Sequence, residues 1–168
     1  TDLEDGVDGV TEFNRGSRPT VRISHRLERV RRPQRYRSTI AHEFGHVVLH
    51  DQLFQDLDPG LGFASAVAVS RDFEKHSEIN DRHQAWMESQ AWYACGALLM
   101  PLTVLQGIVR IECQACEQFG PVWMLGEFGQ ELIRVCADRF EVSQDLARIR
   151  LIKTGALTES PPPRGLFS

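Results

Sequence analysis

Apolar residues in the first third of the chain are spaced as in one strand and one long helix. Apolar and polar residues alternate over residues 20–27, which predicts a strand. After the turn signal at Pro33, apolar residues recur at helical spacing and predict a helix over about residues 34–53. The positions that carry this spacing are Ile40, Phe44, Val47 and Val48.

A second helix, largely buried, is predicted over about residues 83–100, where alanine, tryptophan and leucine fill most positions and Pro101 ends the run. Around it the sequence predicts a short strand, a polar loop and three helices, over residues 64–69, 71–82, 102–110, 121–139 and 143–153. Residues 1–19, acidic and without clear periodicity, are expected to be a flexible lead-in. Residues 158–168 contain three consecutive prolines and are expected to be a disordered tail.

The composition fits one compact globular domain. The chain has 168 residues, of which 42% are hydrophobic and 25% charged. No apolar run approaches the roughly 20 residues that a membrane-spanning helix needs, and no signal peptide is evident. We therefore expect a soluble, cytoplasmic protein, in which four cysteines are too few for a disulfide framework.

Positive charge is concentrated in one segment, although the net charge is −4. Between Arg15 and Arg37 there are nine arginines and a single acid, Glu28. Such a block is most often a solvated surface, but it could bind nucleic acid, and single-stranded DNA acting as an activator is the preferred ligand. The candidate contacts are Arg22, Arg26, Arg29, Arg31, Arg32 and Arg35.

The strongest chemical signal is His-Glu-x-x-His on the first predicted helix. His42 and His46 are four residues apart, so both imidazoles project from one face and can reach one metal ion. Glu43 is then placed to take a proton from a water on that metal. A catalytic zinc usually takes a third protein ligand.

His50 cannot share the same ion, since it lies about 12 Å along the helix from His42. It is expected to be a helix-end group or to support a ligand from behind. Glu88 on the second helix is the better candidate, although a solvated glutamate is equally compatible with the sequence. Weaker candidates fall in or beside the predicted loop, namely Glu74, Glu78, His76 and His83.

Two blocks resemble the ImmA/IrrE family of bacterial zinc metallopeptidases. Residues 37–50, Arg-Ser-Thr-Ile-Ala-His-Glu-Phe-Gly-His-Val-Val-Leu-His, are similar to the family's zinc helix. Residues 88–101, Glu-Ser-Gln-Ala-Trp-Tyr-Ala-Cys-Gly-Ala-Leu-Leu-Met-Pro, are similar to its second helix, which begins with the ligand glutamate. The chain departs from the family pattern at Trp92 and Ala94, where an asparagine and an aromatic residue are usual. A looser likeness, from Phe140 to Gly155, is to the helical segment after the peptidase core and also looks like half of a helix-turn-helix.

The resemblance implies an α+β, zincin-like peptidase domain over residues 20–157, mainly helical, with a small antiparallel sheet and a helical C-terminal extension. It assigns Glu88 as the third zinc ligand. It also implies a cytoplasmic protease that cleaves a helix-turn-helix repressor after stress or DNA damage, and some relatives accompany anti-phage CBASS systems. The basic block favours that branch.

The predicted reaction is zinc-assisted hydrolysis of a peptide bond, with Glu43 moving the proton. Four residues could stabilise the oxyanion: Tyr36, Tyr93, His76 and His83. The alternative function is a zinc-stabilised, nucleic-acid-binding regulatory module without protease activity.

A thiolate in the fourth zinc position would silence such an enzyme. Cys113 is the candidate, chosen narrowly over Cys116, because the segment around both has few apolar anchors. A Cys113–Cys116 redox pair, half of a second zinc site, or two ordinary thiols are the competing interpretations. Cys95 and Cys136 lie in apolar helical stretches and are expected in the core.

Overall fold

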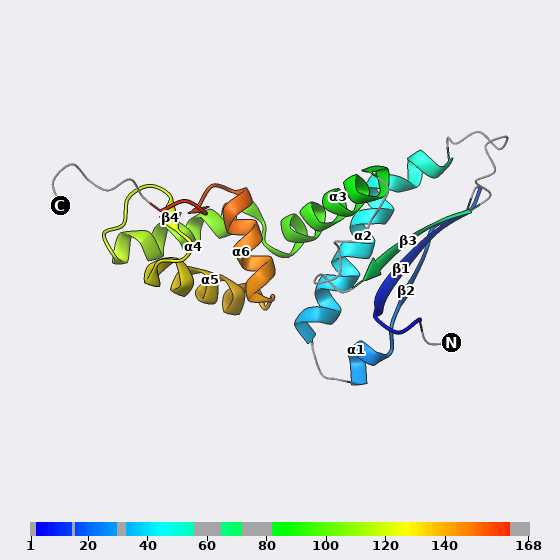
Figure 1. Ribbon diagram of the computed structural model, residues 1–168, viewed down its shortest axis with the longest axis horizontal. Coiled ribbons are helices and arrows are strands. Elements are labelled where there is room, and N and C mark those ends of the chain that lie inside the picture. The colour runs from blue at the N-terminus through cyan, green and yellow to red at the C-terminus, as the bar shows by residue number, and fades with distance from the viewer. Residues whose placement is uncertain (1–2, 15, 30–32, 56–64, 72–81, 162–168) are drawn as a thin grey trace. The chain divides into compact units, whose positions relative to one another are not determined.

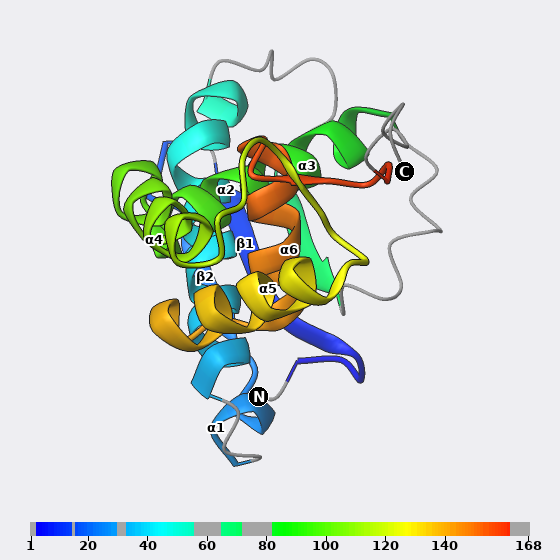
Figure 2. The ribbon, with the colours of Figure 1, turned by 90° about the vertical axis from the view of Figure 1, so that its left-hand side faces the viewer.

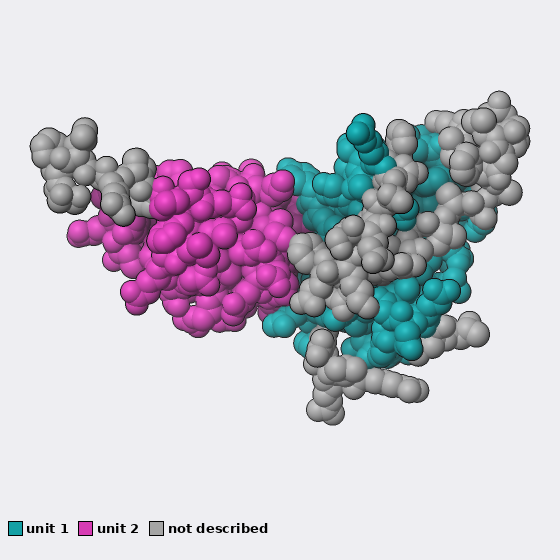
Figure 3. Space-filling model, in the orientation of Figure 1, with its two compact units in different colours: residues 1–95 teal, residues 96–168 magenta. Residues whose placement is uncertain are grey.

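The computed structural model describes residues 3–14, 16–29, 33–55, 65–71 and 82–161. These residues form two compact units, Thr1–Cys95 and Gly96–Ser168 (Figure 3). The predicted domain of residues 20–157 is therefore divided near the end of its second long helix. The α+β class is confirmed, with helices predominating over a small antiparallel sheet.

The sheet of the first unit has three antiparallel strands in the order β2-β1-β3. β1 (Val7–Asn14) is the central strand, between β2 (Thr20–Ile23) and β3 (Ser65–Arg71). The prediction that residues 1–19 are a flexible lead-in is wrong for β1. Two neighbours pair its backbone, and Val7, Val10 and Phe13 are buried. Glycines and acids within the strand obscure its apolar pattern in the sequence.

The strand predicted over residues 20–27 ends earlier, at Ile23. Leu27 instead belongs to the short helix α1 (Arg26–Arg29), where it is buried. The connection is held by the amide of Ser24, which donates a hydrogen bond to the carbonyl of Asp8. The two long helices are confirmed as α2 (Pro33–Gln55) and α3 (Arg82–Leu99).

α2 lies between the sheet and α3 (Figure 1). On its sheet side, Phe54 stacks on Phe13 of β1 with ring centroids 4.4 Å apart. On its other side, Gly45 meets the backbone of Ala91, and a Cβ at residue 45 would lie 3.0 Å from the Ala91 carbonyl oxygen. Glycine here lets the two helices approach closely, which fixes the side chains that α3 presents to α2.

The second unit contains three helices and one parallel pair of short strands. The helices are α4 (Leu102–Ala115), α5 (Glu127–Phe140) and α6 (Gln144–Lys153), and the strands are β4 (Val122–Trp123) and β5 (Leu157–Thr158). Helix α5 begins six residues later than predicted because β4 and a turn occupy residues 122–126. Ser143 caps α6 by accepting a hydrogen bond from the amide of Leu146 at 3.2 Å.

α5 and α6 pack against each other across a short turn (Figure 2). Glu141 ends α5 in the left-handed conformation, with φ 52°. The segment from Phe140 to Gly155, likened above to half of a helix-turn-helix, contains the end of α5, the turn and α6, and the motif itself stays a prediction. Part of the predicted tail is ordered, since Thr158 belongs to β5, and residues 162–168 lie outside the described part of the chain.

Candidate metal centre

The structure brings together the three residues that the sequence nominated as metal ligands. His42 and His46 come from successive turns of α2, and Glu88 comes from the facing α3. Both imidazoles are fully buried, and Glu88 is 4% exposed. The two Nε2 atoms are 3.1 Å apart, and the Glu88 oxygens lie 3.1 Å from His42 Nε2 and 3.2 Å from His46 Nε2.

These spacings fit a small divalent metal. Tetrahedral ligands at 2.0–2.1 Å from one ion lie about 3.3–3.4 Å from each other. The two imidazole nitrogens, and each imidazole nitrogen with its nearer Glu88 oxygen, lie within a few tenths of an ångström of that value, and one ligand atom from each residue lies within 4.8 Å of the other two. Two imidazoles and one carboxylate are also a donor set that holds catalytic zinc, with the fourth position left for water.

The Glu88 carboxyl is held in its ionised, metal-binding form. Burial raises its pKa, but the hydrogen bonds and charges of His42 and His46 together outweigh burial and lower the pKa to about 2. The carboxylate is therefore available as a ligand throughout the physiological pH range.

His50 lies behind His46 rather than beside it. Its Nδ1 is 3.0 Å from Nδ1 of His46, on the far side of the ring from the Nε2 that faces Glu88. Its Nε2 is 3.1 Å from Oε1 of Gln90 on α3. Burial lowers the pKa of His50, against a smaller opposing effect of the Gln90 hydrogen bond. His50 is thus a buried, predominantly neutral imidazole.

Glu43 is fully buried on the sheet side of α2. Its Oε2 accepts a hydrogen bond of 2.5 Å from the Thr11 hydroxyl of β1. Gly9 of the same strand leaves space for this carboxylate, because a Cβ there would lie 2.6 Å from Oε1 of Glu43. The central strand thereby orients the predicted general base.

Trp92 supplies an apolar wall to the cluster. Its ring lies against His42, with centroids 4.3 Å apart. At the position where an asparagine was expected, the chain therefore places an aromatic ring in contact with a predicted ligand. A ring in this position restricts how far the His42 imidazole can turn.

Of the four oxyanion candidates, two have described side chains: Tyr36 is half-buried near the start of α2, and Tyr93 is exposed on α3. The side chain of His83, and all of His76, Glu74 and Glu78, lie outside the described residues. Their predicted roles stay predictions.

Three of the candidate DNA-binding arginines are engaged by acids of the first twelve residues. Arg22 pairs with Glu12, Arg26 with Asp5 at 3.1 Å, and Arg35 with Asp8 at 2.5 Å. The acidic start of the chain thus neutralises part of the basic block. The side chain of Arg29, and all of Arg31 and Arg32, lie outside the described residues.

The cysteines are free thiols in two settings. Cys95 and Cys136 are buried, as predicted, and burial raises their pKa values to about 12 and about 11. Cys113 is half-buried on α4, and burial followed by the nearby Cys116 and Glu112 raises its pKa. A raised pKa leaves less thiolate in the free protein, and the inhibitory role stays a prediction.

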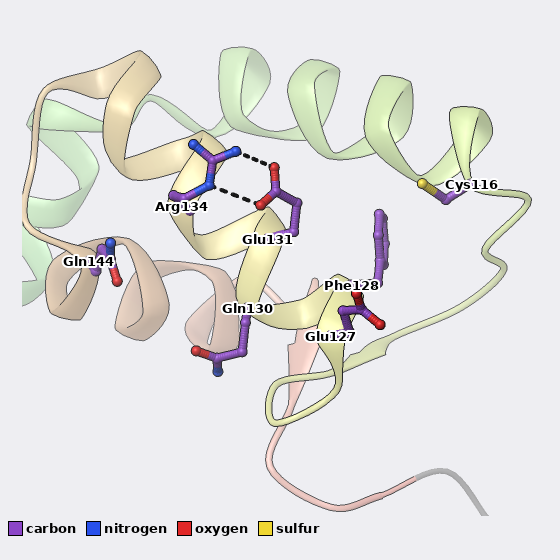
Figure 4. A pocket seen from close by; sticks show the side chains of 7 residues that line it. All are labelled: Cys116, Glu127, Phe128, Gln130, Glu131, Arg134 and Gln144. Carbon is purple, nitrogen blue, oxygen red and sulfur yellow. Dashed lines mark hydrogen bonds and ion pairs between the residues drawn. The ribbon is translucent and has the colours of Figure 1, made fainter.

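A hollow in the second unit lies away from the metal-ligand cluster in the sequence (Figure 4). Its lining residues are Cys116, Glu127, Phe128, Gln130, Glu131, Arg134 and Gln144. Arg134 and Glu131 form an ion pair with each other, at 2.5 Å.

In the described part of the chain, His42, His46 and Glu88 are the one group of three side chains with metal-ligand geometry.

Sequence reasoning missed Gly9, Thr11 and Gln90. Gly9 and Thr11 lie in a segment interpreted as flexible, and no local pattern marks a threonine that will face a glutamate 32 residues away. Gln90 could have been noticed, because it lies two residues after Glu88 on the helix that supplies the third ligand.

No single helix in the described residues is long and apolar enough to cross a membrane, although the bent pair Gln84–Leu99 and Leu102–Ala115 passes that test when taken together.

A search of curated proteins found no match to the chain. The sequence does match the family model Peptidase_M78, described as the IrrE N-terminal-like domain, over residues 4–110. That match covers more than half of the chain and includes β1, α2 and α3, which supply Thr11, Glu43 and the three clustered side chains. The chain therefore belongs to the Peptidase_M78 family of IrrE N-terminal-like domains.

Proposed function

We propose that the protein is a zinc-dependent endopeptidase. The observation that carries this proposal is the buried cluster of His42, His46 and Glu88, which offers two imidazole nitrogens and a carboxylate oxygen within 4.8 Å of one another. When bound there, zinc supplies a Lewis acid that activates water and polarises the scissile carbonyl. Membership in a peptidase family supports the same reading.

Glu43 moves the proton in this scheme. It takes a proton from the attacking water, whose oxygen bonds to the carbonyl carbon, and delivers it to the amine nitrogen as the carbon–nitrogen bond breaks. The Thr11 hydroxyl donates a hydrogen bond to Oε2 of this carboxylate and so helps to hold it in place.

The proposed substrate is a helix-turn-helix repressor, cleaved in the cytoplasm during a stress or DNA-damage response or an anti-phage response of the CBASS type. The family resemblance is what supports this substrate. The probe is a purified helix-turn-helix repressor, mixed with the zinc-loaded protein and followed by mass spectrometry.

Glu43→Gln is the decisive variant. It keeps the shape of the side chain and leaves the three ligands in place, so metal content should match the unaltered protein while cleavage falls by at least about 100-fold. Cleavage by Glu43→Gln at the normal rate would refute the mechanism. If both proteins bind zinc and neither cleaves, the alternative, a zinc-stabilised nucleic-acid-binding module, is favoured.

Two regulatory roles accompany this proposal. Single-stranded DNA would activate the enzyme through the arginine block, with an affinity that falls steeply as salt rises. Oligonucleotide binding at low salt tests this activation, and unchanged cleavage after replacement of Arg29, Arg31 and Arg32 by glutamine would refute it.

Cys113 would restrain the enzyme as a fourth ligand, and an unchanged basal rate of cleavage in Cys113→Ala would refute that role.

A further inference from the structure

We propose that His50 and Gln90 form a hydrogen-bond relay that fixes the tautomer and ring orientation of His46, and thereby raises the metal affinity of the site. This inference rests on the proposed metal-binding function and concerns two residues that contact no metal themselves. They act as positioning residues for a ligand.

The relay is continuous and enclosed. It runs from His46 Nδ1 to His50 Nδ1 over 3.0 Å, and from His50 Nε2 to Gln90 Oε1 over 3.1 Å. Both imidazoles are fully buried and Gln90 is half-buried, so water has little access to compete for these contacts.

The direction of the hydrogen bonds follows from the atoms at the Gln90 end. A carbonyl oxygen only accepts, so His50 must carry its proton on Nε2. In a neutral imidazole the other nitrogen, Nδ1, is then an acceptor, and it accepts a hydrogen bond from the Nδ1–H of His46. In the neutral, metal-binding form, His46 is left with a lone pair on Nε2, the atom that faces Glu88 and His42.

The reversed relay is incompatible with metal binding. If the Gln90 amide presented its NH2 group, both ring protons would shift, and His46 would carry its proton on Nε2. That proton would occupy the position where the metal must bind. The amide orientation of Gln90 therefore selects between a binding and a non-binding form of His46.

The contact between α2 and α3 positions this amide. Gln90 precedes Ala91, which is fully buried and packs against Gly45 at the closest approach of the two helices. Glu88 reaches the His42–His46 pair from the same helix. One packed helix contact thus places the third ligand and the end of the relay.

The test measures zinc affinity of the full chain by competition with a chromophoric chelator. Gln90→Leu and His50→Leu remove the relay and should weaken zinc binding by about 10–100-fold, the usual effect of losing a partner behind a ligand. Gln90→Glu keeps an acceptor at the same point, and His50→Asn keeps a side-chain oxygen near the position of Nδ1. Both should stay close to the affinity of the unaltered chain.

A second readout needs no metal. A long-range 1H–15N spectrum of the metal-free protein should show His50 protonated on Nε2 and not on Nδ1, with that preference lost in Gln90→Leu. Zinc affinity that is unchanged in both leucine variants, or the opposite tautomer at His50, overturns the relay. His42→Ala separates the two proposals: undiminished zinc binding refutes the metal site itself, whereas weakened binding with normal leucine variants refutes the relay alone.

Discussion

Helix α2 of the first unit and the helices of the second unit bury different kinds of side chain. In the first unit, the buried face of α2 is polar, with His42, Glu43, His46 and His50 all fully enclosed. In the second unit, the buried residues are mainly aliphatic, among them Leu105, Leu132, Ile133 and Leu151. Buried polar groups stabilise a fold only when each finds a partner. Helix α2 therefore depends on its ligands and hydrogen bonds, whereas the helices of the second unit depend on packing.

Removal of the metal should cause the largest loss of stability, and this loss should be confined to the first unit. Zinc at 1,000 times its dissociation constant stabilises the form that binds it by about 4 kcal/mol. After chelation, we expect amide hydrogen exchange to accelerate in α2 and α3 up to Cys95, and protection in α5 and α6 to be retained. An equal loss of protection in both units would contradict the inference that the metal stabilises mainly the first unit.

A substitution that creates a cavity in the second unit should have the reverse effect, because it should destabilise the fold and leave metal binding intact. Leu132→Ala removes a side chain that is 1% exposed and should lower the free energy of unfolding by about 2–5 kcal/mol. Zinc affinity should not change. The matched control is Leu125→Ala, which truncates a residue that is 60% exposed and should alter stability by less than about 0.5 kcal/mol. Weakened zinc binding in Leu132→Ala would show that the units are coupled.

Loss of the Thr11 hydroxyl tests whether the polar core of the first unit serves catalysis. Thr11→Val keeps the shape but leaves the buried Glu43 carboxylate without this donor, at a cost of about 1–3 kcal/mol of stability. Cleavage should fall while zinc content stays normal, because no ligand is touched. Thr11→Ser restores the hydroxyl and should recover most of the rate. Equal activity in the valine and serine variants would exclude the positioning role.

The polar buried face of α2 also explains which features could be predicted from the sequence. His42, Glu43 and His46 lie within one helical turn of each other, so their shared chemistry follows from local spacing alone. Glu88 was the preferred third ligand on the sequence alone, but the family resemblance was needed to assign it, since no spacing rule links it to α2. The long helix was predicted from Ile40, Phe44 and Val48, yet these apolar residues are exposed and the polar ones are buried. A functional core inverts the usual amphipathic pattern.

Long-range pairing accounts for the remaining errors. β1 is a strand because β2 and β3 pair with it, and β3 lies more than 50 residues later in the chain. The acids that made residues 1–19 look unstructured include Asp8 and Glu12, which meet Arg35 and Arg22. Two oppositely charged segments that each suggested a solvated surface are in fact partners. No local pattern encodes that pairing.

Acid titration of the metal-free protein should give the smallest effect, again confined to the first unit. The folded-state pKa of Glu88 is lowered from 4.5 to about 2, so the stability it contributes is fully present above about pH 4.5 and is lost as pH falls toward 2. Relative to its value at pH 6, the free energy of unfolding at pH 3 should fall by about 2 kcal/mol on this account. In Glu88→Gln that part of the acid dependence should vanish, while other titrating groups remain as a common background. The measurement is urea unfolding at both pH values in a Trp123→Phe background, which leaves Trp86 and Trp92 of the first unit as the fluorescent reporters. An equal loss of stability in the two proteins would mean that Glu88 is not the stabilised carboxylate, and that the buried cluster does not hold its charge before the metal arrives.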